Sequence, residues 1–257
     1  MSGRGKTVKQ TNENRLLFVH GWGLDSGLAQ VLFSEMQSPV TATGIDLPGY
    51  GRVPMIEDYT LDTLVQAVLG SVEQPVTLVG WSLGGMIAAW ATILFPERVS
   101  RLVLINATPC FVEKKRWHCG MQKKIFHQFA KSAENNMDAT RKRFLSLLFP
   151  VGTDAREGLR KLHAYVHTAP APHADALDQG LELLAFADIR YRLLEISCPT
   201  LILHGTGDRL VPECAAREFR TEIEDARLEF ISHGGHAPFL TRPRHTAGLI
   251  DAFLAAN

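Results

Sequence analysis

The sequence has no long hydrophobic run, since none of its apolar stretches approaches the roughly 20 residues that a membrane-spanning helix needs. It also lacks the apolar core of a secretion signal, because the basic first nine residues are followed by the polar stretch 11–14. We therefore predict a protein that has no membrane segment and works in the cytoplasm.

Cysteine is scarce, and its four residues are widely scattered: Cys110, Cys119, Cys198 and Cys214. They lack the close pairs of a zinc site and are too few for a disulfide scaffold. We expect reduced thiols, with Cys110 and Cys119 simply buried or at the surface.

Metal-ligand patterns are also missing. His163 and His167 stand four residues apart and would share a helix face, but no third ligand is evident. We expect neither a metal site nor a cofactor.

The chain has no net charge, because 27 Lys and Arg balance 27 Asp and Glu. We expect no nucleic-acid partner. The balance conceals a segregation: residues 114–161 hold 12 basic and 4 acidic residues, a local charge of +8 against −8 elsewhere. Such a segment favours an acidic protein partner, although an ordinary solvated helix face would also be basic.

The length of 257 residues, with 46% hydrophobic and 21% charged residues, suits one soluble domain. We expect the protein to act as a monomer. Strand-like apolar runs occur at 16–19, 76–79, 102–105, 200–203 and 228–231, and helix-like stretches between them include 61–71, 83–95 and 214–223. Apolar strands that alternate with helices indicate a mostly parallel sheet with helices on both faces. The predicted fold class is α/β.

This alternation is interrupted between residues 111 and 188, where the pattern indicates helices, for example at 123–131 and 140–148. We predict a helical cap at 111–188, inserted into a core made of 1–110 and 189–257. A crevice between the two would be a natural ligand site.

A candidate nucleophile follows the second strand-like run, in the motif Gly80-Trp81-Ser82-Leu83-Gly84. Strand, tight turn and helix in this order are typical of a nucleophile elbow, which lifts a serine hydroxyl out of the sheet. A glycine-rich turn without a catalytic serine is the alternative interpretation.

An acid and a base follow in the order Ser, Asp, His. Asp208 comes after the strand at 200–203, and His236 lies on a glycine-rich loop after the strand at 228–231. Because the carboxyl ends of parallel strands share one edge, we predict that Ser82, Asp208 and His236 form a catalytic triad. Asp208 as a helix cap and His233 as the base remain alternatives.

The oxyanion hole is expected from two backbone amides. His20-Gly21-Trp22-Gly23 follows the first strand, and Leu83 opens the helix after Ser82. The amides of Trp22 and Leu83 would stabilise the charge that develops when Ser82 attacks an ester, before water cleaves the acyl-enzyme.

These residues resemble the pimeloyl-acyl-carrier-protein methyl ester esterases of biotin synthesis, which have the α/β-hydrolase fold. The similarity runs through most of the chain and rests on the motifs at 19–24, 46–51, 80–85, 95–99, 108–111, 143–145 and 236–239. It implies hydrolysis of the methyl ester at the far end of a pimeloyl chain that stays linked to its carrier protein.

The resemblance also implies an acyl pocket and a docking surface. The pocket would comprise Trp22, Trp81, Ser82, Leu83, Phe144, Leu145, Ser146, Leu147, Leu148 and His236. The acidic carrier protein would dock on Arg143, Arg156 and Arg160, with Arg141 and Lys142 nearby. A general carboxylesterase, a carbon–carbon bond hydrolase and a non-catalytic receptor on the same scaffold are the competing functions.

Overall fold

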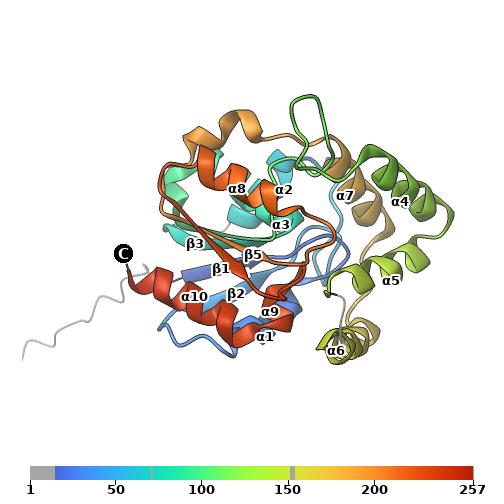
Figure 1. The fold of residues 1–257 in the computed structure, drawn as a ribbon, viewed down its shortest axis with the longest axis horizontal. Coiled ribbons are helices and arrows are strands. Elements are labelled where there is room, and N and C mark those ends of the chain that lie inside the picture. The colour runs from blue at the N-terminus through green and yellow to red at the C-terminus, as the bar shows by residue number, and fades with distance from the viewer. Residues whose placement is uncertain (1–14, 71, 151–153, 257) are drawn as a thin grey trace, which may run out of the picture.

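The computed structural model describes residues 15–70, 72–150 and 154–256. Six strands form one sheet in the order β2-β1-β3-β4-β5-β6, and every neighbouring pair is parallel (Figure 1). The strands are β1 (Arg15–Val19), β2 (Thr41–Ile45), β3 (Val76–Trp81), β4 (Val99–Ile105), β5 (Thr200–Gly205) and β6 (Ala226–Ile231). The α/β class is confirmed.

The strand that the sequence did not predict is β2. It lies at the edge of the sheet, carries the short sequence Thr-Ala-Thr-Gly-Ile, and has no fully buried residue. An edge strand needs no continuous apolar run, so it gives little hydrophobic signal.

Helices cover both faces of the sheet, with α2, α3 and α8 on one side and α1, α9 and α10 on the other (Figure 1). The α-helices are α1 (Gln30–Phe33), α2 (Leu61–Leu69), α3 (Leu83–Leu94), α4 (Lys123–Asn135), α5 (Met137–Leu147), α6 (Asp154–Thr168), α7 (Ala174–Phe186), α8 (Glu213–Glu222), α9 (Pro238–Thr241) and α10 (Pro243–Ala255). Short 3-10 helices lie at Ser26–Ala29, Pro96–Arg98 and Arg190–Glu195. In the described part of the chain, no helix is long and apolar enough to cross a membrane.

The helix α5 begins three residues earlier than the pattern suggested, at Met137. The side chain of Asn136 accepts a hydrogen bond of 2.9 Å from the amide of Ala139 and so caps the first turn. Asn is among the preferred residues at this position because its oxygen satisfies an amide that the helix cannot.

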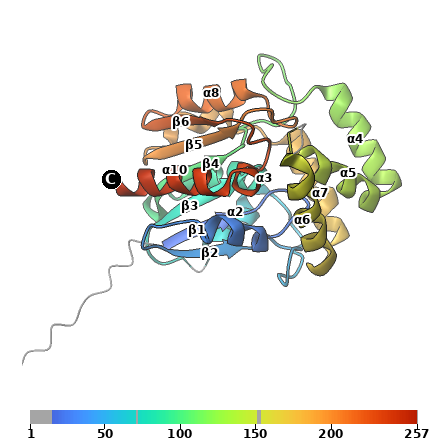
Figure 2. The ribbon, with the colours of Figure 1, turned by 60° about the horizontal axis from the view of Figure 1, so that its bottom comes forward.

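The helices α4 to α7 follow β4 and precede β5, and they gather at one end of the molecule beside the sheet (Figure 2). Aromatic contacts attach them to the core, since the ring of Trp22 meets Phe144 at 5.0 Å and Phe129 at 5.7 Å between centroids. These inserted helices therefore cover the ends of the strands where we expected the site.

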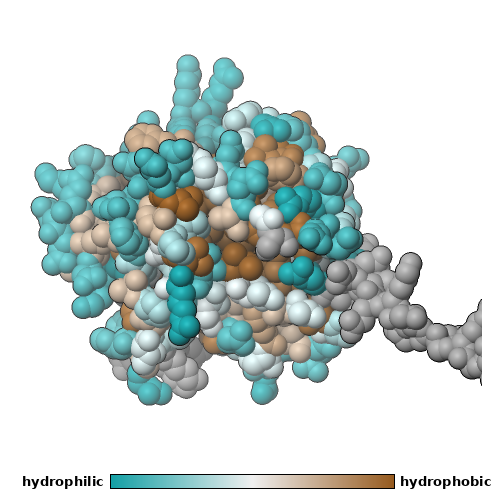
Figure 3. Space-filling model, turned by 180° about the vertical axis from the view of Figure 1, so that it is seen from behind, coloured by the Kyte–Doolittle hydropathy of each residue, from teal (hydrophilic) through white to brown (hydrophobic). Residues whose placement is uncertain are grey.

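The core is centred on β3 and α3. All six residues of β3 are buried, as are 11 of the 12 residues of α3. Burial on both sides explains why these segments show an almost continuous apolar sequence. The face shown in Figure 3 is mainly hydrophilic, with hydrophobic residues gathered near its middle.

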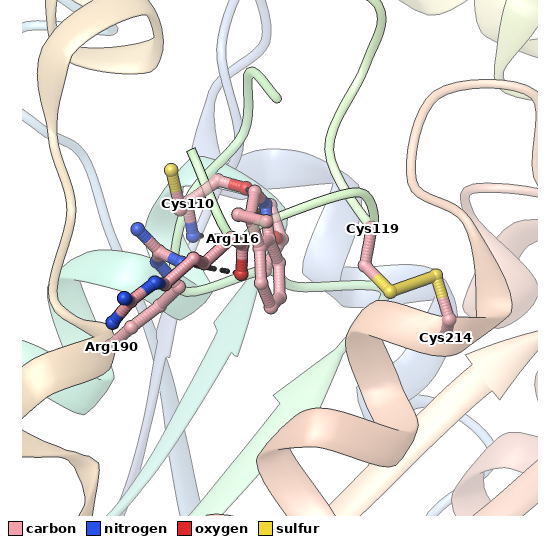
Figure 4. Close-up of a disulfide and its surroundings, with 7 residues drawn as sticks. Cys110, Arg116, Cys119, Arg190 and Cys214 are labelled. Atoms are coloured by element: carbon pink, nitrogen blue, oxygen red, sulfur yellow. Dashed lines mark hydrogen bonds between the residues drawn. A yellow bond between two sulfur atoms is a disulfide. The ribbon is translucent and has the colours of Figure 1, made fainter. Parts of the chain in front are cut away.

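A disulfide joins Cys119, in the loop before α4, to Cys214 near the start of α8 (Figure 4). The prediction of thiols at these two positions is therefore wrong. The prediction of a reducing compartment depended partly on it. The two residues are 95 apart in sequence, yet their Cα atoms lie 5.5 Å apart, a separation that sequence spacing does not show. Cys110 and Cys198 are free.

Candidate active site

Ser82 occupies the turn between β3 and α3 and adopts a strained backbone conformation. Its φ is +56°, a region that non-glycine residues rarely enter, and such strain is often found at functional sites. The glycines around it are required by close packing, because a Cβ at Gly84 would overlap the carbonyl oxygens of Val19 and His20. The flanking glycines therefore let the elbow press against β1.

Ser82, His236 and Asp208 form a hydrogen-bonded chain. His236 Nε2 lies 2.9 Å from Ser82 Oγ, and His236 Nδ1 lies 2.7 Å from Asp208 Oδ2. The His236 and Asp208 side chains are almost completely buried, whereas Ser82 keeps 9% of its surface exposed. The three residues that we predicted from separate motifs thus meet at one edge of the sheet.

The surroundings of Asp208 keep its carboxyl ionised. Burial alone would raise the pKa of this group, but the interactions with His236, His204 and the amide of Leu210 together outweigh that effect and lower the pKa below its usual value. The amides of Leu210 and Val211 also donate to Oδ1, at 2.8 and 3.1 Å. Asp208 therefore faces His236 as a carboxylate.

Asn106, which we did not predict, connects three parts of the site. It follows β4, is fully buried, and has a φ of +46°. Its Nδ2 donates to Asp208 Oδ2 at 2.7 Å and to the carbonyl of Gly235 at 3.0 Å, and its Oδ1 accepts from the amide of Gly205 at 3.1 Å. No short motif marks this residue, and only the strand order could have suggested it.

The loop that carries His236 is held from two sides. The indole of Trp81 donates to the His236 carbonyl at 2.7 Å, and the His236 amide donates to the Leu148 carbonyl at 2.9 Å. His233, the alternative base, is exposed, and its backbone amide donates to the hydroxyl oxygen of Thr206 at 3.0 Å. His236 is therefore the histidine that faces Ser82.

His20 supports the neighbouring loop as a neutral residue. Burial lowers its pKa, its Nδ1 lies 2.8 Å from the carbonyl of Gly21, and its Nε2 accepts from the amide of Leu47 at 3.0 Å. The geometry fixes the proton on Nδ1.

The expected oxyanion residues belong to segments next to Ser82, because Leu83 follows it in the chain and Gly21, the residue before Trp22, lies against its side chain. Leu83 is the first residue of α3, where a backbone amide has no acceptor within the helix. Trp22 is buried, and its indole donates to the Leu177 carbonyl of α7 at 2.8 Å. The next residue, Gly23, donates to the hydroxyl of Tyr50 at 3.3 Å and accepts from Arg141 Nε at 2.7 Å.

The position of Arg141 corrects one prediction. Only 9% of this residue is exposed, and its guanidinium supports the Trp22 loop instead of a docking surface. Lys142, Arg143 and Arg160 are exposed, as the docking role requires. The side chain of Arg156 lies outside the described residues.

A cavity of about 360 Å³ lies beside the hydrogen-bonded chain. Trp22, Phe144 and Leu147 line it, as predicted, together with other aromatic and aliphatic side chains. Its wall also includes Arg209 and Leu210, which directly follow Asp208. The cavity therefore adjoins the site, and its volume lies in the range of small-molecule pockets.

The other residues expected in the pocket lie elsewhere. Trp81, Leu145 and Leu148 are buried and do not line the cavity, and Ser146 is exposed and donates its hydroxyl hydrogen to the Arg143 carbonyl. These four positions do not suit direct contact with a ligand in the cavity. Ser82, Leu83 and His236 are also not among the residues that line the cavity.

The fold and the geometry of the site define a hydrolase, and comparison with known proteins agrees. The model of the alpha/beta hydrolase family matches residues 16–247, and the chain belongs to this family. Among solved structures, the esterase from Exiguobacterium antarcticum superposes with a TM-score of 0.85 at 23% identity, covering 94% of this chain and 92% of that one. The bromoperoxidase from Bacillus anthracis also gives 0.85, at 21% identity over 95% and 92% of the two chains.

Relatives that are more similar in sequence share the name of one carboxylic ester hydrolase. The pimeloyl-acyl-carrier-protein methyl ester esterase of Methylococcus capsulatus is 35% identical, covering 100% of this chain and 97% of its own. The esterase of the same name from Serratia marcescens is 32% identical over 95% of both chains. The resemblance that the sequence motifs indicated is confirmed.

Proposed function

We propose that the protein is a serine esterase in which Ser82 is the nucleophile, His236 the general base and Asp208 the orienting acid. The observation that carries this proposal is the continuous chain from Ser82 Oγ to His236 Nε2 and from His236 Nδ1 to Asp208 Oδ2. Acyl transfer by a serine requires a base that accepts the proton of the hydroxyl and an acid that orients this base, and these contacts suit both roles.

In the proposed mechanism, neutral His236 takes the proton of Ser82 as its oxygen attacks the ester carbonyl. The amides of Trp22 and Leu83 stabilise the resulting oxyanion, and each donor contributes about 10² to 10³ in rate at comparable sites. His236 then gives its proton to the leaving alcohol, which leaves an acyl-enzyme on Ser82. Water activated by His236 cleaves that ester, and the carboxylate product departs.

We propose as substrate the methyl ester of a pimeloyl chain that is linked to acyl carrier protein, so that the freed carboxylate serves biotin synthesis. The names of the relatives support this substrate, and the mainly apolar cavity suits an aliphatic chain. Lys142 and Arg143 on α5 and Arg160 on α6 would attract the acidic carrier.

The inserted segment 111–188 then acts as a cap over the core, which comprises 1–110 and 189–257. One chain contains the triad and the whole cavity, and this supports action as a monomer. Size-exclusion chromatography with light scattering tests the oligomeric state.

The main experiment compares three ester classes with the parent enzyme and Ser82→Ala. We expect the carrier-linked pimeloyl methyl ester to give a higher kcat/KM than a short soluble ester, no turnover of a vinylogous diketone, and no activity in Ser82→Ala. Equal rates on both esters would indicate a general carboxylesterase, and cleavage of the diketone would indicate a carbon–carbon bond hydrolase. Activity that survives in Ser82→Ala would refute the mechanism.

A test in cells uses a biotin-requiring strain that lacks its own esterase. We expect the parent gene to restore growth without biotin, whereas the gene for Ser82→Ala should not. Failure of the parent gene to restore growth, with normal expression, would argue against the pimeloyl substrate.

A further inference from the structure

The cavity that adjoins Asp208 through Arg209 and Leu210 has two positive charges in its wall and no carboxylate. Arg143 of α5 and Arg209 of the loop after β5 both line it. The rest of the wall is apolar or neutral, with Gln128, Ser132 and Thr140 as its polar members. An apolar cavity with this charge favours a ligand that combines a hydrocarbon chain with an anionic group.

Neither guanidinium has an ion-pair partner among the described residues. Other arginines of the molecule are engaged: Arg141 donates to the carbonyl of Gly23, and Arg190 pairs with Asp188 at 2.6 Å. Arg143 and Arg209 are both exposed, so their donors are available to a ligand.

The two arginines belong to different parts of the chain. Arg143 lies on an inserted helix, while Arg209 directly follows Asp208 in the core. An anion that contacts both would connect the inserted helices to the loop of the proposed catalytic acid. A guanidinium suits such an anion because its planar donors bind phosphate or carboxylate oxygens in pairs.

We propose that Arg143 and Arg209 bind the phosphodiester of the prosthetic arm that links the acyl chain to its carrier protein. This inference rests on the proposed function. The methyl ester and the thioester of that substrate are uncharged, so the phosphodiester is the anion on the part that enters the enzyme. The carboxylate of the hydrolysed chain offers the same chemistry from a second source, and the experiment separates the two.

The experiment compares two soluble substrates, the pimeloyl methyl ester thioesters of pantetheine and of phosphopantetheine. Phosphopantetheine ends in a phosphate monoester at the position of the phosphodiester. For the parent, we expect a higher kcat/KM with the phosphorylated substrate. In Arg209→Gln, the ratio of the two kcat/KM values should fall about tenfold, as expected for the loss of a charge-assisted hydrogen bond.

The matched control is Arg220→Gln, because Arg220 is an exposed arginine of α8 outside the cavity wall. This variant should keep the ratio of the parent. In the double variant Arg143→Gln/Arg209→Gln, the fold decrease of this ratio should be smaller than the product of the fold decreases in the two single variants, since both residues contact one anion. A ratio in Arg209→Gln equal to that of the parent would overturn the inference.

The carboxylate source is tested by inhibition with the hydrolysed product, pimeloyl-pantetheine. The contrary outcome is that Arg209→Gln weakens this inhibition about tenfold and leaves unchanged the ratio of kcat/KM for the phosphorylated thioester to kcat/KM for the unphosphorylated one. In that case the arginines bind the carboxylate, and the phosphodiester assignment is wrong. Turnover of the unphosphorylated thioester by the parent tests the proposed function separately. If the enzyme prefers another acyl group, the same pair of thioesters with that group still gives the ratio.

Discussion

Asn106 donates a hydrogen bond of 2.7 Å to Asp208 Oδ2, the same carboxylate oxygen that lies 2.7 Å from His236 Nδ1. The amide also contacts Gly205 and Gly235, so that it joins β5 to the loop of His236. A buried amide with all these partners holds the acid and the base at a fixed separation. We therefore regard Asn106 as a positioning residue.

Asn106→Asp should make activity depend on pH in a distinctive way. The substitution keeps the shape but replaces the donor with an acceptor, so two carboxylates face each other at neutral pH, and we expect kcat to fall about 10²-fold. At lower pH, the new carboxyl binds a proton and can donate again. The ratio of variant to parent kcat should therefore rise as pH falls.

The control for this prediction is Asn106→Leu, which has no group that titrates. Its activity relative to the parent should stay low at every pH, and thermal unfolding measures the stability of both variants. A pH-independent ratio for Asn106→Asp would mean that the donor to Asp208 is unimportant.

Asp208→Asn should lower kcat by about 10⁴-fold. The amides of Leu210 and Val211 donate to Oδ1, which fixes the amide oxygen of the new side chain on that side. Its NH₂ group then faces His236 Nδ1 and forces the proton onto Nε2, where His236 cannot accept the proton of Ser82. Steady-state kinetics with a soluble ester measures the loss, and a loss of only a few-fold would mean that another acid acts.

Salt should distinguish carrier-linked from soluble substrates. Raising the salt concentration from about 0.05 to 0.5 M shortens the distance over which surface charges interact. The kcat/KM should therefore fall sharply for the carrier-linked ester and little for a short neutral ester. Replacing Lys142 and Arg160 by Gln should flatten the salt response of the carrier-linked substrate. Equal salt responses of the two substrates would argue against docking on this face.

Reduction of the disulfide should destabilise the protein. The bond between Cys119 and Cys214 closes a loop with a sequence separation of 95, and cross-links of this kind typically contribute about 2–4 kcal/mol to the free energy of unfolding. Denaturant unfolding with and without a reductant measures this difference. Cys214→Ser should lose the sensitivity to reductant, whereas Cys198→Ser, which changes a free cysteine, should keep it.

The sequence predicted that Ser82, Asp208 and His236 come together because each of these residues has a local signal. Ser82 lies in a glycine-flanked turn, and Asp208 and His236 each follow a strand-like run, so the rule that parallel strands end at one edge brought them together. Asn106 has no such signal. Its role depends on a left-handed backbone conformation and on the neighbours that β4 gains from the strand order.

Two other predictions failed because they depended on three-dimensional detail. Arg141, Lys142 and Arg143 are adjacent in sequence, but the phase of α5 buries the first and exposes the other two. Cys119 and Cys214 approach each other only because the loop before α4 reaches α8. Neither helix phase at single-residue accuracy nor long-range pairing can be inferred from spacing alone.

The uniform direction of the strands has a practical consequence. Because β1 begins at the edge opposite Ser82, and α10 ends at Ala255 far from the inserted helices, both ends of the described chain lie on the side away from the cavity (Figures 1 and 2). A fluorophore or a solid support attached at a surface residue close to Arg15 or Ala255 would leave the cavity open to the solution. Immobilised forms of the enzyme should therefore still receive substrates as bulky as a folded protein.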